Sequence, residues 1–302
     1  MKNYLTDVPG VKVGHVSNQQ AKTGCTVIVT ENGATAGVDI RGSAPGTRET
    51  ALLDPLKTVE EIHGVLLTGG SAFGLAAADG VMNALEEKEI GFDVGVTKVP
   101  IVPAAVVFDL EQGQAQIRPD KEMGYQAVQN SSSTEDRTGQ IGAGTGCSVG
   151  KLLGPQQTSP GGLGSASLKL NNNTYVSALV VVNAFGDILD EQGNIIAGCK
   201  DEDGNFINTY QALQNEEISG FGKNTTLGLI ATNAKLSKTQ ANKVAQVAHN
   251  GYAQHIRPVH TMLDGDTIFA LSTGQEKVEF NLLATAASDV MGQAIINAID
   301  NV

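Results

Sequence analysis

The chain has 302 residues, with 20 Lys and Arg against 32 Asp and Glu, and therefore a formal net charge of −12 at pH 7. An acidic chain without a basic run repels phosphate groups, so neither nucleic acid nor an anionic membrane is an expected partner. Hydrophobic residues make up 41% and charged residues 17%, which indicates a globular chain. At about 150 residues per domain, the length allows one large domain or two ordinary ones.

The sequence predicts a cytoplasmic protein. No stretch approaches the roughly 20 continuous apolar residues that span a bilayer, and residues 1–7 lack the apolar stretch of a signal peptide. The three cysteines, Cys25, Cys147 and Cys199, are far apart and odd in number. Such usage suits a reducing compartment and predicts no disulfide framework.

Short apolar runs rich in β-branched residues alternate with turn residues through the first two thirds of the chain. They predict strands at 25–29, 36–40, 64–68, 101–108, 165–170 and 176–183. A helix is expected over 73–89, after the turn residues Gly69 and Gly70, with Ser71 as its N-cap. Its run of small residues at 76–80 predicts close packing against a sheet.

The last third of the chain predicts strands that alternate with longer helices. The expected order is a strand at 225–232, a helix at 237–255, a strand at 266–272 and a helix at 280–299. Ser237 can cap the first helix, with Gln240 in the capping-box position. Strands followed by paired helices suggest helical layers outside packed sheets.

The segment 199–224 is polar, acidic and poorly periodic, and it is predicted to be a long loop. A structureless loop of this size inside a compact domain is uncommon and often functional. It ends at Asn224, directly before a predicted buried strand. A plain surface excursion explains the segment equally well.

Metal sites find no support in the sequence. Neither a Cys-x-x-Cys pair nor a His-Glu-x-x-His motif occurs. The spacing of His249, His255 and His260 fits no zinc-protease pattern and favours structural or surface histidines. Asp201 begins a stretch similar to a calcium loop, but Ala212 stands where the twelfth-position Glu belongs. We therefore expect no metal and no cofactor.

Two other catalytic patterns also fail. In the Gly-rich stretch 142–151, Thr145 occupies the place of the first P-loop glycine, and Leu152 follows Lys151 in place of Ser or Thr. A turn that brings Lys151 close to a site stays open. Ser71 has Phe73 two residues on, where the nucleophile elbow of serine hydrolases requires Gly.

The Asn224-Thr225 junction offers a different nucleophile. A Thr at a new chain N-terminus carries its own base, the α-amino group, whose pKa is about 7.7–8.0. The hydroxyl would first attack the preceding carbonyl, and water would then resolve the ester. The alternative is that Thr225 is only the first residue of a strand.

Three polar residues could serve such a nucleophile. Asn183 follows an apolar run, and its amide could donate to an oxyanion, an effect of about 3–4 kcal/mol when preorganised. Asp264 and Asp266 are one residue apart, so they could share a face of a strand and orient an ammonium. A plain Asp-Gly turn is the simpler explanation of these two carboxylates.

These residues belong to a longer series of motifs. In chain order the motifs are VGH (13–15), GVDIRG (37–42), PGTRE (45–49), LTGGSAFGL (67–75), IVP (101–103), GAGTG (142–146), VVNA (181–184) and NTTL (224–227). With them, nearly the whole chain resembles the L-aminopeptidase/D-esterase and β-aminopeptidase family. The Asn-Thr junction and the Asp-Gly-Asp at 264–266 look closest to its nylon-oligomer (6-aminohexanoate-oligomer) endo-hydrolase branch.

This resemblance implies an α+β fold, a four-layer helix–sheet–sheet–helix sandwich similar to N-terminal nucleophile hydrolases but differently connected. It implies a single domain over 1–302 that cuts itself between Asn224 and Thr225. The products would be a large subunit, 1–224, and a small subunit, 225–302, assembled as a homotetramer of such pairs. Family members need no metal.

The resemblance also implies the site and its substrates. The catalytic residues it implies are Thr225, Asn183, Lys151, Asp264 and Asp266. Phe108 aligns with a family Tyr near the oxyanion and would line the substrate pocket, so the oxyanion role rests more on Asn183. The implied substrates are small peptides, β-peptides or ω-amino-acid oligomers.

Two other functions remain as alternatives. Ornithine acetyltransferase is related in fold and also begins its small subunit with Thr, but its Ala-Thr-Met-Leu junction differs from the NTTL found here. A non-catalytic binding protein on the same fold would show no backbone cleavage and no acyl-enzyme.

Overall fold

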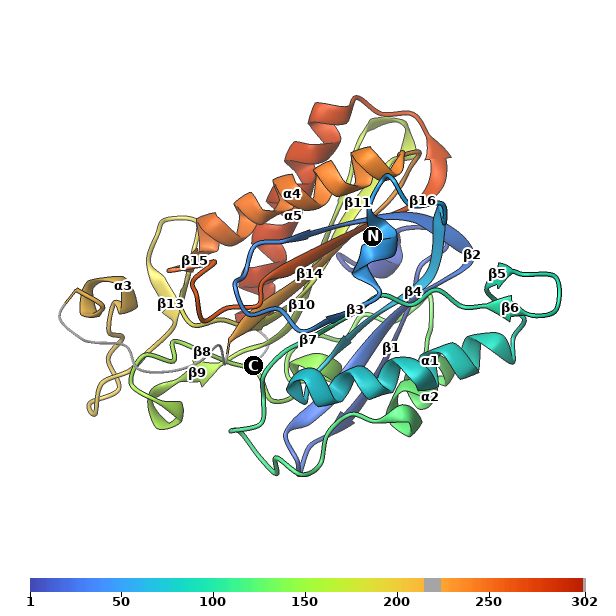
Figure 1. Cartoon of the computed structure of the whole chain (residues 1–302). Coiled ribbons are helices and arrows are strands. Elements are labelled where there is room, and N and C mark those ends of the chain that lie inside the picture. Colours follow the sequence, from blue (N-terminus) through green and yellow to red (C-terminus); the bar gives the residue numbers. More distant parts are fainter. Residues whose placement is uncertain (215–223, 301–302) are drawn as a thin grey trace.

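The computed structural model describes residues 1–214 and 224–300 (Figure 1). In these ranges the main sheet has nine strands, in the order β10-β11-β14-β16-β2-β4-β7-β3, with β1 paired to β2. Its strands are β1 (Lys12–Asn18), β2 (Thr23–Ile40), β3 (Thr47–Arg48), β4 (Glu61–Thr68), β7 (Ala104–Val106), β10 (Gly162–Lys169), β11 (Tyr175–Asn183), β14 (Thr225–Ala234) and β16 (Thr267–Glu276). The α-helices are α1 (Ala77–Glu86), α2 (Lys121–Gln129), α3 (Thr209–Ala212), α4 (Lys238–His255) and α5 (Phe280–Asp300).

Short strands form three smaller sheets within the described ranges. They pair β5 (Phe92–Asp93) with β6 (Lys98–Val99), β8 (Ser148–Val149) with β9 (Ser159–Pro160), and β12 (Asp187–Leu189) with both β13 (Ile195–Ala197) and β15 (Ile256–Arg257). The β8–β9 and β12 sheets lie close to the end of β11, where they support the site described below.

The long strand β2 joins the two halves of the main sheet. Its first half pairs with β1 and with most of β4, and its second half pairs with β16. The register against β4 shifts between Val29 and Ala34. Irregularities of this kind bend a strand and increase its twist, so the two halves can face each other.

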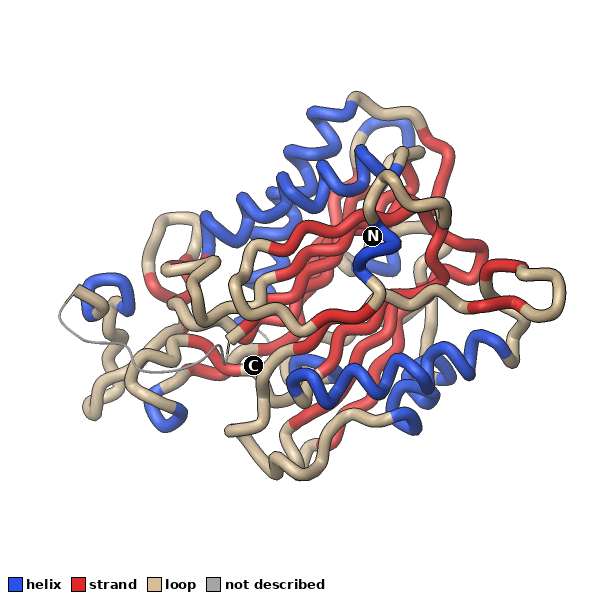
Figure 2. The backbone as a smooth tube through the Cα atoms, in the orientation of Figure 1, coloured by secondary structure: helices blue, strands red, loops and turns tan. Residues whose placement is uncertain are grey.

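Alternate side chains of each half point into different cores, as the period of a strand requires. In β11, Leu179 lies in the core between the sheet halves, and Val180 packs toward α4 and α5. In β2, Ile28 lies in the same central core, and Val27 packs toward α1 and α2. Figure 2 shows the two helix pairs on opposite outer sides. The expected helix–sheet–sheet–helix sandwich is confirmed.

Three elements of the first half differ from the sequence prediction. The strands expected at 25–29 and 36–40 are one strand, β2, and the run 101–108 contributes only β7. The helix expected over 73–89 begins as a 3-10 helix (Ser71–Ala76) and continues as α1. Ser71 is not its N-cap: it has a φ of 54°, and Gly70 precedes it without a side-chain cap.

The small residues of α1 allow a close crossing with α2. A Cβ added at Gly80 would meet the Lys121 carbonyl oxygen at 1.7 Å, and one at Gly124 would meet that of Ala77 at 1.9 Å. Only glycine permits backbones to approach so closely. The composition of this helix therefore reflects packing against a second helix as well as against the sheet.

The last third of the chain follows the prediction closely. Ser237 and Gln240 form the expected capping box at the start of α4. Helix α5 packs on α4, β10 and β11. By length and composition α5 could cross a membrane, but 61% of its apolar stretch is buried inside the protein, as in the core helices of many folds.

Part of the predicted loop 199–224 is anchored to strand β12 of the small three-stranded sheet. It contains a bridge between Lys200 and Phe206 and the short helix α3. The buried carboxylate of Asp187 accepts hydrogen bonds from the backbone N–H and the hydroxyl of Thr209, each at 2.7 Å. Residues 215–223 of the predicted loop lie outside the described residues.

Candidate active site

The candidate site lies where the end of β11 meets the start of β14. In the antiparallel register, Asn183 is the direct partner of Thr225. Both residues are buried, with exposed fractions of 0% and 5%. The apolar runs predict each strand by itself, but only the pairing of the strands places this amide beside this hydroxyl.

The peptide bond between Asn224 and Thr225 is held by the segment that precedes β16. The backbone N–H of Asn224 donates to the carbonyl oxygen of Leu263 at 3.3 Å, and the N–H of Gly265 donates to the carbonyl oxygen of Asn224 at 3.0 Å. The Thr225 hydroxyl donates to the same Asn224 oxygen. The nucleophile expected from the sequence therefore contacts the carbonyl group that it would attack.

The 264–266 segment is held by backbone hydrogen bonds on a second side. The backbone N–H of Ala44 donates to the Asp264 carbonyl at 2.9 Å, and those of Arg41 and Gly42 donate to the Asp266 carbonyl at 3.0 and 3.2 Å. Residues 41–44 thus hold the segment from the side opposite to Asn224. This places the motifs at 37–42 and 45–49 next to the site.

The side chain of Asn183 has partners on both sides. Its amide nitrogen donates to the Phe108 carbonyl oxygen at 3.0 Å, and its amide oxygen accepts from the Lys151 ammonium at 2.7 Å and from the Ser148 N–H at 3.2 Å. The Lys151 ammonium also donates to the Asn183 carbonyl at 3.2 Å. The amide is therefore fixed in orientation, and one of its two N–H groups is committed to Phe108.

Lys151 brings a positive charge into a buried environment. Burial lowers the pKa of its ammonium to about 8, and the nearby Cys147 and Asp264 oppose this shift only in part. At neutral pH the ammonium is therefore still mostly charged. A charge-assisted bond to the Asn183 oxygen is stronger than a neutral one and holds the amide in place.

The carboxylates of Asp264 and Asp266 bind different groups. Asp264 accepts from the Thr261 hydroxyl at 2.5 Å and, more weakly, from the Phe185 N–H at 3.4 Å. Asp266 accepts from the Thr226 N–H at 2.8 Å. Burial, followed by the charge of Asp266, raises the pKa of Asp264 to about 6.

The residues that the family resemblance implies for the site all lie in this one hydrogen-bonded region. Thr225 and Asn224 lie at its centre, Asn183 and Lys151 lie on the β11 side, and the two aspartates lie on the β16 side. Phe108 contributes its backbone carbonyl, and its side chain is only partly buried. Both aspartates precede β16, which begins at Thr267, and Asp264 forms an isolated bridge with Asn224.

Sequence reasoning missed four contributors. Ser148 contacts Asn183, and His260 contacts Asp266. Thr261 contacts Asp264, and Gly265 contacts Asn224. The sequence did not indicate a role for Gly265, because an Asp-Gly pair is typical of an ordinary turn. Within residues 1–214 and 224–300, no group of three or more His, Cys, Asp or Glu side chains is placed to hold a metal ion.

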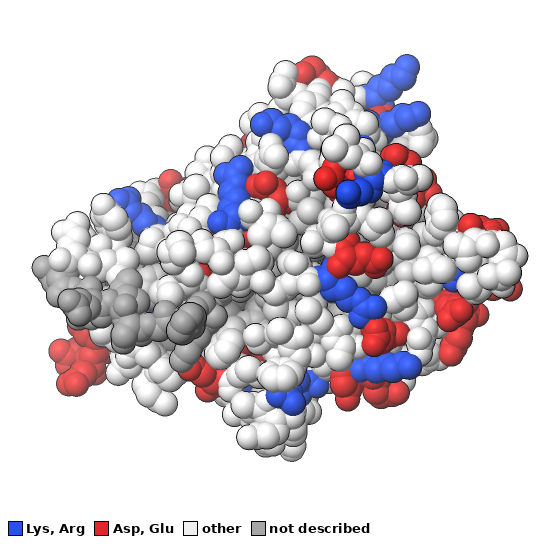
Figure 3. Space-filling view, viewed as in Figure 1, with Lys and Arg blue, Asp and Glu red and all other residues white. Residues whose placement is uncertain are grey.

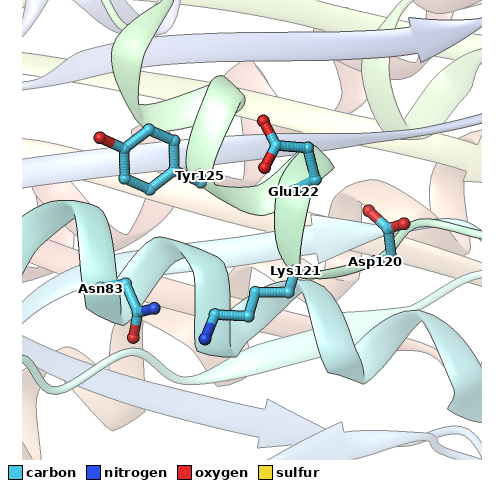
Figure 4. Close-up of a pocket in the computed structure, with 5 residues that line it drawn as sticks. All are labelled: Asn83, Asp120, Lys121, Glu122 and Tyr125. Carbon is cyan, nitrogen blue, oxygen red and sulfur yellow. The ribbon is translucent and has the colours of Figure 1, made fainter.

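A surface hollow elsewhere on the molecule is separate from this region. Its lining residues are Asn83, Asp120, Lys121, Glu122 and Tyr125 (Figure 4). They come from α1, α2 and the N-cap of α2, in an outer helical layer. The face shown in Figure 3 intersperses Lys and Arg with Asp and Glu, so no single sign of charge marks it.

Comparison with known proteins gives a consistent picture. The sequence profile of peptidase family S58 matches residues 3–301. An uncharacterized aminopeptidase of Mycobacterium leprae is 42% identical over 313 residues, covering 95% of this chain and 82% of the relative. A 6-aminohexanoate-oligomer endohydrolase of Kocuria sp. is 32% identical over 311 residues, covering 97% and 84%.

A solved structure supports the fold. The L-aminopeptidase D-ala-esterase/amidase of Ochrobactrum anthropi, described as a variant of the Ntn hydrolase fold, superposes with a TM-score of 0.75. The alignment covers 98% of this chain and 85% of that one, at 18% identity. At this identity the likeness shows the fold alone.

Proposed function

Because this chain belongs to peptidase family S58, we propose that it cleaves itself between Asn224 and Thr225 and then uses Thr225 as an N-terminal nucleophile. Family membership makes the protein an amide-bond hydrolase of the peptidase type. The identity of its nucleophile and the self-cleavage are the parts of the proposal that the experiment below tests. The family profile and the named relatives favour hydrolysis over acyl transfer to ornithine and over a purely binding role.

One observation carries the proposal. The Thr225 hydroxyl contacts the carbonyl oxygen of Asn224, and the Gly265 N–H donates to that same oxygen. Attack of the hydroxyl oxygen on the Asn224 carbonyl carbon would place negative charge on the oxygen that Gly265 already contacts. A preorganised donor at a developing oxyanion is among the strongest catalytic effects available to a protein.

Self-cleavage then proceeds in two steps. The Thr225 oxygen adds to the Asn224 carbonyl carbon, its proton passes to the Thr225 nitrogen, and the C–N bond breaks to leave an ester and a free amine. Water adds to the ester carbonyl, and the C–O bond breaks. The products are a new carboxylate at Asn224 and a free hydroxyl and amine on Thr225.

Substrate hydrolysis repeats this chemistry with an external amide. The free amine of Thr225 accepts the hydroxyl proton and returns it to the leaving amine. Asp266, through the Thr226 N–H, holds the start of β14 in register, and Lys151 holds the amide of Asn183 beside the nucleophile. Asn183 can still offer its second N–H to the oxyanion.

The substrate class follows from the relatives. One relative is named an aminopeptidase and another a 6-aminohexanoate-oligomer endohydrolase. We therefore propose small peptides, β-peptides or ω-amino-acid oligomers as substrates, with Phe108 near the pocket. The homotetramer and the cytoplasmic location expected above remain predictions.

Intact-mass analysis of the purified protein tests the proposal. A mass of 31.3 kDa, divided in proportion to 224 and 78 of 302 residues, gives subunits of about 23 and 8 kDa. Thr225→Ala is expected to remain one chain and to be inactive on a panel of α-amino, β-amino and 6-aminohexanoyl amides. An uncut wild-type chain, or activity in Thr225→Ala, would refute it.

A further inference from the structure

A cluster of aromatic side chains, two of them buried and one partly buried, contacts the candidate site through Asp266. His249 and Tyr252 extend from α4, and His260 lies between β15 and β16. The ring centroids of His249 and His260 are 4.8 Å apart, and those of His249 and Tyr252 are 5.2 Å apart. For both histidines, the sequence pattern predicted only a structural or surface role.

His260 is the member of this cluster that reaches the site. Its backbone N–H and its Nδ1 both contact Oδ2 of Asp266, at 3.1 and 2.7 Å. The other oxygen of Asp266, Oδ1, accepts from the Thr226 N–H at 2.8 Å. The carboxylate thus bridges His260 and the residue that follows the nucleophile, and it is itself only 1% exposed.

The contact with Oδ2 of Asp266 is compatible with one tautomer of His260. A carboxylate oxygen accepts hydrogen bonds, so the tautomer that carries its proton on Nδ1 satisfies this contact. Nε2 has no partner within the described residues, as is also true of the Tyr252 hydroxyl. The ring of His260 is therefore held at Nδ1, and its other side faces the rings of His249 and Tyr252.

The backbone at His260 is left-handed. Its φ is 55°, a conformation that is uncommon for residues other than glycine, although histidine adopts it more often than most. Such conformations persist where surrounding contacts over-determine the residue, and they are concentrated at functional sites. Here the conformation directs both the N–H and Nδ1 of one residue to a single oxygen.

We propose that His260 is a positioning residue for self-cleavage. It clamps Oδ2 of Asp266, so that Oδ1 holds the Thr226 N–H and fixes the start of β14 with the Thr225 hydroxyl against the Asn224 carbonyl. This inference rests on the proposed self-cleavage, because it concerns the geometry of that step. In this role His260 exchanges no proton with the reacting atoms.

Three substitutions at this position test the clamp. His260→Asn keeps a donor at the place of Nδ1 and tolerates the left-handed backbone. His260→Gln places its amide nearer the position of Nε2, and His260→Ala removes the donor. Loss of a hydrogen bond to a charged group predicts self-cleavage slower by about tenfold or more in the Gln and Ala variants. The Asn variant is expected to stay within about threefold of wild type on the same scale.

Rates of self-cleavage are followed by intact mass after synthesis of the full chain. Thermal unfolding midpoints are measured on uncut chains that carry each substitution together with Thr225→Ala. Tyr252→Phe is the matched control from the same cluster, and it is expected to cleave like wild type. Equal rates in the Asn, Gln and Ala variants, or equal slowing in Tyr252→Phe, would overturn the clamp. A wild-type chain that never cleaves would instead refute the proposed function, and the inference with it.

Discussion

The backbone N–H of Gly265 donates to the carbonyl oxygen of Asn224 at 3.0 Å, within the bridge that pairs Asn224 with Asp264. A side chain at Gly265 would not fit, because an added Cβ would lie 2.8 Å from the Thr225 hydroxyl oxygen and 2.7 Å from the Ala44 carbonyl oxygen. The donor, the carbonyl and the nucleophile are therefore packed against one another. Gly265 and Asn224 come from segments that are far apart in the chain.

Gly265→Ala is expected to slow self-cleavage by about 100-fold, the usual cost of losing one oxyanion donor. The methyl group would push the 264–266 segment away from Asn224 and lengthen the N–H contact. Intact mass against time after synthesis measures the rate. Gly64→Ala in β4 is the control, since its added Cβ would meet its nearest neighbour, the Ile28 carbonyl oxygen, at 3.1 Å. Cleavage of Gly265→Ala at the wild-type rate would remove Gly265 from the mechanism.

Asn183→Leu is expected to lower the free energy of unfolding by about 2–4 kcal/mol, because it leaves buried polar groups without partners. The groups left behind are the Phe108 carbonyl and the Ser148 N–H, and the Lys151 ammonium loses its shorter contact with this side chain. Urea unfolding of the chain that also carries Thr225→Ala measures the change in the uncut state. Gln116→Leu, at an exposed position, controls for the change of residue type and should be nearly neutral. A neutral Asn183→Leu would contradict the network described here.

Self-cleavage is expected to be fastest between about pH 6 and about pH 8. As the pH falls through 6, Asp264 is protonated, since its pKa is raised to about 6 by burial and by Asp266. Its neutral form accepts the Thr261 bonds less well, so the bridge to Asn224 loosens. As the pH rises through 8, Lys151 loses its proton, since burial lowers its pKa to about 8, and the charged bond to Asn183 is lost.

Lys151→Met separates the two limbs of this profile. The variant is expected to be slower throughout and to keep the rise near pH 6 without the fall above pH 8. Rates of self-cleavage at constant ionic strength from pH 5 to 9.5 give both profiles, with wild type measured in the same buffers. A fall above pH 8 that persists unchanged in Lys151→Met would assign that limb to another group.

Ser237→Ala tests the capping box at the start of α4, away from the site. It is expected to reduce the free energy of unfolding by about 1 kcal/mol, because the Gln240 N–H loses its acceptor. Urea unfolding measures the loss, and Ser237→Asp should recover most of it, since Asp is an equally good cap. Self-cleavage should proceed in both variants, as neither changes the 224–225 junction.

Local signals predicted the elements of the last third well. Helix α4 was predictable because a capping box and a 3.6-residue apolar period are both encoded within one short segment. Strand β14 was predictable because residues 225–232 form a continuous run without a charged side chain. The first half was less predictable: the polar residues Glu31 and Asn32 interrupt the apolar pattern, so β2 reads as two strands, although the backbone continues through them.

The sequence alone indicated helical layers outside packed sheets, an Asn-Thr pair directly before a buried strand, and the residue types that the proposed chemistry needs, since periodicity and residue chemistry are properties of short segments. Only the tertiary structure decided that Asn183 lies opposite Thr225, that Gly265 donates to Asn224, and that His260 meets Asp266. These contacts depend on strand register and on the bridge before β16, which are set by pairing across long distances in the chain. A shift of one residue in that pairing would turn the amide of Asn183 to the other face of the sheet.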